Sequence, residues 1–222
     1  MATRNAKWTE VLVGVAVGMV TVASLGCSTA YYSAWEMLGQ EKRDLLRSNV
    51  SAVREEQDEA ADQFESALDR LRELTGVDAG ELEDVYDDLS ADYEDAQGRA
   101  DGVEERFEKI DSIANDLFAE WEGEIGEISN ADMRTKSRRK LDETRRNYAR
   151  LESSLRKSEA SMEPVLTQLK DNVLFLKHNL NAAAIGGLTA EVADIEADID
   201  SLIADMRASI AEADRFLQTL PE

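Results

Sequence analysis

Cysteine, histidine, proline and glycine are all scarce in this 222-residue chain. The single cysteine, Cys27, excludes an internal disulfide and a cysteine-based metal cluster, and the single histidine, His178, excludes a site with several histidine ligands. Two prolines and 12 glycines allow few turns, so the secondary-structure elements must be long. Cations are also few, with 25 Lys and Arg against 47 Asp and Glu and a net charge of -22. Such a surface repels nucleic-acid phosphates, and we expect no binding to DNA or RNA.

Motifs for catalysis are missing as well. The chain has no Gly-x-x-x-x-Gly-Lys-Ser/Thr loop for nucleotide phosphates and no Glu-x-x-His pair for a di-metal bundle. The lone His178 lies beside a core stripe, where a polar residue is more often satisfied within a bundle than functional. Four acidic residues have the spacing of a calcium loop but lack its turn glycine, which indicates a solvated helix face: Asp194, Glu196, Asp198 and Asp200. We therefore expect no enzymatic activity and no cofactor or metal.

The first 26 residues have the features of a secretory signal peptide. Arg4 and Lys7 precede a charge-free run from Val11 to Leu25, and the small residue Gly26 follows. A helix that crosses a bilayer needs roughly 20 apolar residues, so this run is short for a membrane span. We therefore expect residues 1–26 to be removed from the mature protein.

Cys27 follows this segment directly, an arrangement that resembles the lipobox of bacterial lipoproteins. The resemblance implies cleavage before Cys27 and lipid attachment to its sulfur, which would hold the protein on a membrane. The next residue is Ser28 rather than an acidic retention signal. This implies an exported outer-membrane lipoprotein that faces the periplasm, with the inner membrane as second choice. An uncleaved anchor helix with an incidental cysteine is the alternative.

From about Glu41 onward, apolar residues recur alternately at every third and fourth position, a period typical of coiled-coil packing. The first of these seams contains one polar member, Gln57, and the last includes Ile210. Pro164 lies inside the third seam and is expected to kink its helix. The seams predict four helices, over roughly 41–75, 80–128, 131–184 and 189–219.

Three short turns separate these helices, near Gly76, at 129–132 and at 185–189. Short turns between long helices make neighbours antiparallel. We therefore expect an all-α, elongated, antiparallel four-helix bundle or coiled coil over residues 41–222, preceded by a lipidated juxtamembrane linker at 27–40. Because the central helices are longer, their hairpin should protrude past residue 41 by about a dozen residues, roughly 20 Å.

The distribution of charge supports the central hairpin. Residues 81–128 hold 18 acidic and 3 basic side chains, whereas residues 129–180 hold 7 acidic and 12 basic ones. Each exposed pair contributes under about 1 kcal/mol, but the pattern favours one register. A turn near Ser129 would place three consecutive cations opposite three glutamates: Arg138, Arg139 and Lys140 opposite Glu120, Glu122 and Glu124.

Two clusters are candidates for contact with a membrane or a partner. Tyr31, Tyr32 and Trp35 closely follow Cys27 and suit the level of lipid head groups. Alternatively, residues 30–40 extend the first helix. The second cluster, at the hairpin tip, joins Trp121 to cations that would bind anionic head groups or an acidic partner: Lys136, Arg138, Arg139 and Lys140, with Arg134, Arg145 and Arg146 nearby. Pairing of these cations with the acidic second helix is the alternative.

Four stretches together make the chain similar to a known family: AYYSAWEMLGQEKRDLL (30–46), LFAEWEGEI (117–125), RRKLDETRRNYARLE (138–152) and MEPVLTQLKDNVLFLKHNLNA (162–182). The chain resembles a family of helical bacterial lipoproteins catalogued as a domain of unknown function. Some of its members carry automatic labels such as DNA repair protein or ATPase. The resemblance implies an all-helical periplasmic lipoprotein and brings no established activity or catalytic residues. The missing phosphate loop and the acidic surface argue against both labels.

These observations predict a membrane-anchored coiled-coil scaffold or adaptor of the bacterial cell envelope, held by acylated Cys27 and bound to an envelope protein. The alternative is a ligand-, lipid- or metal-binding module, or an accessory subunit of an envelope enzyme complex. A polar pocket would favour this alternative, and a continuously apolar core would favour the scaffold. The sequence leaves the oligomeric state open.

Overall fold

The computed structural model describes the backbone of residues 27–74, 82–179 and 182–220, and the side chains of residues 41–73, 82–179 and 192–220. Four helices account for these residues: α1 (Cys27–Leu74), α2 (Leu82–Glu127), α3 (Ala131–His178) and α4 (Ala182–Thr219). No strand occurs in the described ranges. The expected signal peptide, residues 1–26, lies outside them.

The chain divides into two compact units, Met1–Glu41 and Lys42–Glu222. α1 belongs to both units because it begins at Cys27. The segment 27–40, expected as a linker, is therefore helical, in agreement with the alternative that it extends the first helix. The helix formers Ala, Glu, Met, Leu and Gln are concentrated at positions 34–40 and favour this extension, although Gly39 costs about 1 kcal/mol.

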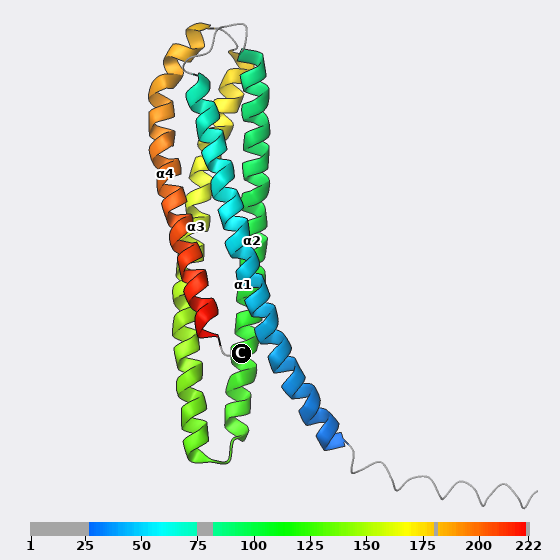
Figure 1. The fold of residues 1–222 in the computed structure, drawn as a ribbon. Coiled ribbons are helices and arrows are strands. Elements are labelled where there is room, and N and C mark those ends of the chain that lie inside the picture. Colours follow the sequence, from blue (N-terminus) through cyan, green and yellow to red (C-terminus); the bar gives the residue numbers. More distant parts are fainter. Residues whose placement is uncertain (1–26, 75–81, 180–181, 221–222) are drawn as a thin grey trace, which may run out of the picture. The chain divides into compact units, whose positions relative to one another are not determined.

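Within Lys42–Glu222 the four helices pack antiparallel as a bundle (Figure 1). Contacts join α2 to α3 and α3 to α4, and Arg106 of α2 pairs with Glu56 of α1 at 2.7 Å. α4 closes the ring against α1, where Arg54 pairs with Asp214 at 3.0 Å. The prediction of an all-α antiparallel four-helix bundle is confirmed.

The predicted seams form the core of this bundle, and nearly all of their described side chains are buried. Val85, Tyr93 and Trp121 are partly buried against it. The seam of α4 is wrong at one position, because Ser209 is fully buried whereas Ile210 is only half-buried. A helix with 3.6 residues per turn drifts against a strict seven-residue repeat, so either residue could have faced the core at this level.

Polar groups interrupt the apolar core. Gln57 of α1 is fully buried, and its Nε2 donates a hydrogen bond to Ser158 Oγ of α3 at 3.2 Å. Within the described part of the chain, Gln57 Oε1 and Ser209 Oγ have no hydrogen-bond partner. The core is therefore not continuously apolar, and unmatched polar groups lie in its interior.

Asn130 is the N-cap of α3, and its side chain accepts hydrogen bonds from the backbone N–H groups of Asp132 and Met133 at 3.0 and 3.1 Å. Such a cap contributes about 1 kcal/mol, and an acidic first turn suits the positive end of the helix dipole. The predicted turn at 129–132 is thus confirmed. α3 then runs on through the exposed Pro164; the kink expected there stays a prediction.

The third turn falls earlier than predicted. α3 ends at His178, and the backbone N–H of Asn179 donates to the carbonyl oxygen of Leu176 at 3.0 Å. α4 begins at Ala182, so the predicted turn at 185–189 lies inside the first turns of α4. Three alanines at 182–184 favour helix there, and two glycines at about 1 kcal/mol each do not end it.

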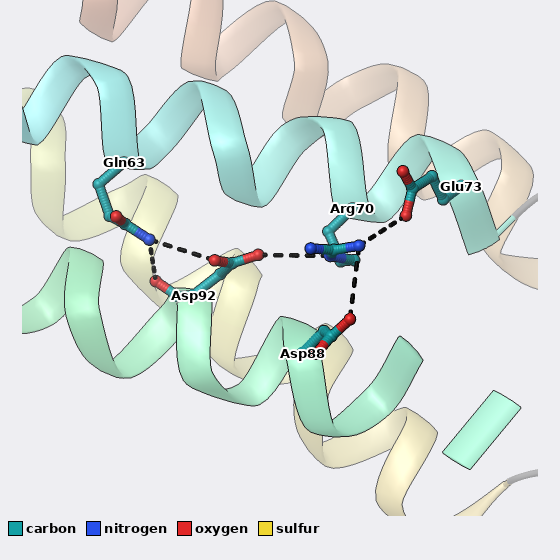
Figure 2. A network of polar contacts seen from close by, with 5 residues as sticks. All are labelled: Gln63, Arg70, Glu73, Asp88 and Asp92. Atoms are coloured by element: carbon teal, nitrogen blue, oxygen red, sulfur yellow. Dashed lines mark hydrogen bonds and ion pairs between the residues drawn. The ribbon is translucent and has the colours of Figure 1, made fainter. Parts of the chain in front are cut away.

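A polar network ties α1 to α2 near the end of α1 (Figure 2). Arg70 contacts Glu73 of its own helix at 2.9 Å, and Asp88 and Asp92 of α2 at 3.4 and 3.6 Å. Gln63, two turns earlier on α1, donates to Asp92 Oδ1 at 3.3 Å. One cation therefore bridges two helices of this acidic end of the bundle. The loop between them, residues 75–81, lies outside the described part.

Candidate interaction surface

Trp121 and Glu122 connect the two helices at the hairpin end, the region around the α2–α3 turn. Trp121 Nε1 donates to Ser137 Oγ at 3.0 Å. Glu122 accepts from Arg138 and Arg145, each at 2.9 Å. These guanidiniums, Arg145 first, lower the pKa of the Glu122 carboxyl below its usual value. The predicted pairing across the hairpin is thus confirmed for Arg138 and Glu122.

The neighbouring cations do not pair as predicted. Lys140 pairs with Glu143 of its own helix at 3.3 Å. Glu120 pairs with Lys42 of α1 at 3.2 Å. Arg139 forms no ion pair with any residue that the structure describes. Successive residues of a helix are about 100° apart, so three consecutive side chains cannot all face α2.

The Lys42–Glu120 pair also shows how far the hairpin end extends past Lys42 along the bundle. α2 continues beyond Glu120 to Glu127, a length of about 10 Å at helical rise. The hairpin therefore extends past Lys42 by about half the predicted distance. The prediction assumed that α1 and α2 are level at the loop that joins them. Lys42, 32 residues before the end of α1, instead pairs with Glu120, 38 residues after the start of α2.

Four exposed cations on the outer side of α3, here called the cationic face, have no ion-pair partner among the described residues: Lys136, Arg139, Arg146 and Arg150. Most other cations of the described chain are paired across or along helices. Three exposed lysines also have no ion-pair partner among the described residues, but they are scattered over α2 and α3: Lys109, Lys170 and Lys177. A group of unpaired cations on one helix face is notable in a chain of net charge -22.

The other residues considered from the sequence are placed as follows. Trp121 is partly buried and packs against the core. Tyr31, Tyr32 and Trp35 belong to α1, but their side chains, like that of Cys27, lie outside the described residues. His178 is exposed at the end of α3, so the expectation of a place inside the bundle is wrong. Its side chain faces solvent.

An acidic groove of about 440 Å³ runs between α2 and α3. Its carboxylates come from both helices: Asp101 and Glu104 from α2, Glu159 and Glu163 from α3. Burial is the main cause that raises the pKa of Glu159, and repulsion from Glu104 and Glu108 adds to it, while Arg156 acts in the opposite direction. The groove therefore concentrates negative charge that this chain does not fully compensate.

A second acidic groove, of about 680 Å³, lies between α3 and α4 and is lined by Asp171, Asn172 and Phe175 of α3 and by Asp194 and Asp198 of α4. Asn172 is only 8% exposed. Its Nδ2 donates to the carbonyl oxygen of Gln168 at 2.8 Å, and its Oδ1 has no partner among the described residues. Phe175, at the rim, is 39% exposed.

Neither groove was predicted from the sequence. The exposed Asp194 and Asp198 agree with the solvated face expected there. A signal for Asn172 was available, because it stands three residues after Leu169 in the core seam, where a polar residue is out of place. The carboxylates of the α2–α3 groove are far apart in sequence and come together only through the hairpin.

Among the described residues, no group of three or more His, Cys, Asp or Glu side chains is arranged to hold a metal ion. The helices within these ranges include none that is long and apolar enough to cross a membrane.

The described residues thus define a helical bundle protein with one cationic face and two acidic grooves. The chain belongs to the family described as protein of unknown function (DUF2959), whose model matches residues 31–220. The resemblance to a family catalogued as a domain of unknown function is confirmed at that level. No curated protein and no solved structure matches the chain.

Proposed function

We propose that this protein is a membrane-anchored scaffold or adaptor of the bacterial cell envelope. The anchor is lipid on Cys27, supported by the charge-free run at 11–25 and by Gly26 directly before the cysteine. Acyl chains contribute about 0.8 kcal/mol per buried methylene, so several of them hold a protein stably on a membrane. The protein then resides on the outer membrane and faces the periplasm.

The cationic face is the observation that carries the binding role. Its four cations face solvent without an ion-pair partner in the described chain, although the protein carries 47 acidic side chains. Such a patch attracts acidic surfaces and sets the orientation in which they dock. It is also firmly supported, because α3 is 48 residues long and its inner side is buried along most of that length. A rigid, charged surface of this kind suits an adaptor that holds an acidic protein.

Photo-crosslinking in whole cells tests the proposal. A photoreactive residue replaces Arg139 in one lipidated protein and Lys109 in a control, since Lys109 is also exposed and unpaired among the described residues. We expect capture of an acidic envelope protein from position 139 only. Capture of lipid alone, or equal capture from both positions, contradicts the adaptor role.

A matched pair of charge variants measures the strength of the contact. One variant changes Lys136, Arg139 and Arg146 to Gln, and the control changes Lys109, Lys170 and Lys177 to Gln. Both lose the same charge, but only the first loses the cationic face. Three exposed pairs at up to about 1 kcal/mol each predict a loss of up to roughly a hundredfold in affinity for the captured partner. Equal losses in both variants would mean that net charge, not this face, governs binding.

A further inference from the structure

The outermost line of α3 changes its chemistry half-way along the helix. Residues seven apart fall on the same line in a coiled coil. Arg139 and Arg146 begin this row, and four uncharged, exposed residues, here called the neutral ridge, continue it: Ser153, Ala160, Thr167 and Leu174. In a chain with 32% charged residues, four successive uncharged positions on an exposed line are unexpected for a solvated face. Leu174, which closes the row, is 44% exposed.

The neutral ridge lies between the two acidic grooves. The α2–α3 groove borders it through Glu163, and the α3–α4 groove borders it through Asp171. Neither carboxylate forms an ion pair with a described residue. On the α4 side, residues 191–205 contain six acidic and no basic side chains. The second half of α3 is therefore an uncharged strip with an excess of negative charge on both sides. Lys170 in the α2–α3 groove and the pairs Lys157–Asp205 and Arg72–Glu196 compensate only part of this charge. The excess is complementary to the cationic face of the first half.

We propose that a second copy of this chain occupies this surface, in an antiparallel twofold dimer. The cationic face of each copy lies on the neutral ridge of the other, between its two acidic grooves. The inference rests on the proposed function in one respect, since both make the cationic face a contact surface, and the second copy and the acidic envelope protein would compete for it. A twofold interface is self-complementary, so one favourable contact between two halves of α3 occurs twice.

The distribution of charged and uncharged residues along α3 also defines a register for the dimer, that is, which residues of one copy lie level with which residues of the other. If Arg139 of one copy is level with Asp171 of the other, the symmetry axis passes half-way between them, at the level of Leu155. Arg150 then lies level with Ala160, where small side chains allow close approach. Met133 comes within about 3 Å along the axis of the level of Phe175. These two exposed apolar side chains, 62% and 39% exposed, would thus be covered at both ends of the contact.

One unfavourable feature of the single chain supports the same contact. Glu159 is crowded by Glu104 and Glu108, which helps to raise its pKa, and cations of a second copy would relieve that repulsion. An anionic lipid surface would engage the cationic face but would leave the neutral ridge and both grooves uncovered.

Disulfide trapping tests the geometry directly. In the full chain with Cys27→Ser, a Ser153→Cys substitution places one thiol next to the proposed axis, where it meets its own copy. We expect a covalent dimer on mild oxidation that reductant reverses. Ser201→Cys on α4, which is also exposed, is the control and should stay monomeric. A monomer from Ser153→Cys, or equal dimer from both variants, overturns the proposal.

Charge reversal tests the pairing by sedimentation of the full chain at low and physiological salt. Arg139→Glu with Arg146→Glu should abolish the dimer, as should Asp171→Lys with Glu163→Lys, because this register places Arg146 within one residue of the level of Glu163. All four changes in one chain should restore it, because the reversed charges again face each other. Lys109→Glu with Arg215→Glu matches the charge change elsewhere and should remain dimeric. Circular dichroism confirms that each variant is folded. Failure of the fourfold variant to dimerise, while folded, overturns the pairing.

The outcomes separate this inference from the proposed function. A wild-type monomer that still crosslinks to an acidic envelope protein from position 139 removes the dimer and leaves the adaptor role intact. A dimer that captures no other envelope protein removes the adaptor role and leaves the dimer intact. Binding to anionic vesicles alone, with no dimer at any protein concentration, contradicts the inference in favour of a lipid contact.

Discussion

Replacement of Gln57 by leucine should stabilise the bundle although it removes a hydrogen bond. Gln57 is fully buried, and its Nε2 donates to Ser158 Oγ at 3.2 Å. Its Oε1, in contrast, meets no donor among the described residues. The side chain therefore makes one neutral hydrogen bond and leaves one strong acceptor without a partner in the core, between the apolar residues Val53 and Phe64.

The magnitudes decide the sign of the effect. A neutral hydrogen bond contributes about 0.5–1.5 kcal/mol net. The substitution removes the partnerless Gln57 Oε1 but leaves the buried Ser158 Oγ without its partner, and these two effects, at about 1–3 kcal/mol each, roughly offset one another. Burial of a leucine side chain adds about 1.5–3 kcal/mol, an upper bound because the unfolded chain already buries part of its apolar surface. Leucine should therefore raise the free energy of unfolding by about 1 kcal/mol or more, which is about 2–4 °C in Tm for a chain of this size.

Urea titration and thermal scans, followed by far-UV circular dichroism, measure this difference. Gln57→Ala is the matched control, because it removes the same amide without filling the space, and it should destabilise the protein. Gln57→Leu combined with Ser158→Ala should be at least as stable as Gln57→Leu alone. If Gln57→Leu lowers the free energy of unfolding by more than about 1 kcal/mol, the amide oxygen must have a partner, such as a bound water, and the reasoning fails.

Three further predictions concern titration, processing and ligands. The pKa of Glu159 is raised above its usual value of 4.5, so its charged form destabilises the folded protein at pH values above 4.5. Glu159→Gln should therefore stabilise the protein at neutral pH and have no effect below pH 4.5; equal effects in urea titrations at both pH values would contradict this. Cys27→Ser should block lipid attachment and signal cleavage, and a normally processed N-terminus by mass spectrometry would exclude the lipoprotein. The purified protein should contain no stoichiometric transition metal and gain no thermal stability from ATP with magnesium, as elemental analysis and thermal shift can check.

Periodic apolar residues made most of the fold predictable. The α1 and α3 seams are buried along nearly their whole described length, including Gln57, which the spacing alone placed inside. The α2–α3 turn was predictable because Asn130 has a local role as an N-cap. Signals of this kind depend on neighbours within one or two turns, which a sequence displays directly.

The errors share a different origin. The glycines at 186–187 suggested a turn, but α4 begins before them, at the alanines 182–184, and continues past them. Ser209 rather than Ile210 is buried because a helix of 3.6 residues per turn drifts against the seven-residue repeat from which the seam was assigned. The two acidic grooves depend on which residues of separate helices become level with each other. That information is contained in the register of the bundle, not in any one segment.

Position on the helix, more than total charge, separates cations that stabilise this bundle from cations free to bind elsewhere. Arg138 and Arg145 lie on the side of α3 that faces α2, so Glu122 is within reach of both. Arg139 follows Arg138 and Arg146 follows Arg145 by one residue, a rotation of about 100° that turns them away from Glu122. Within α3 their close counter-charges are Asp142 and Glu143, one helical turn away, and neither arginine forms an ion pair with a described residue. Both guanidiniums are therefore available to a second molecule.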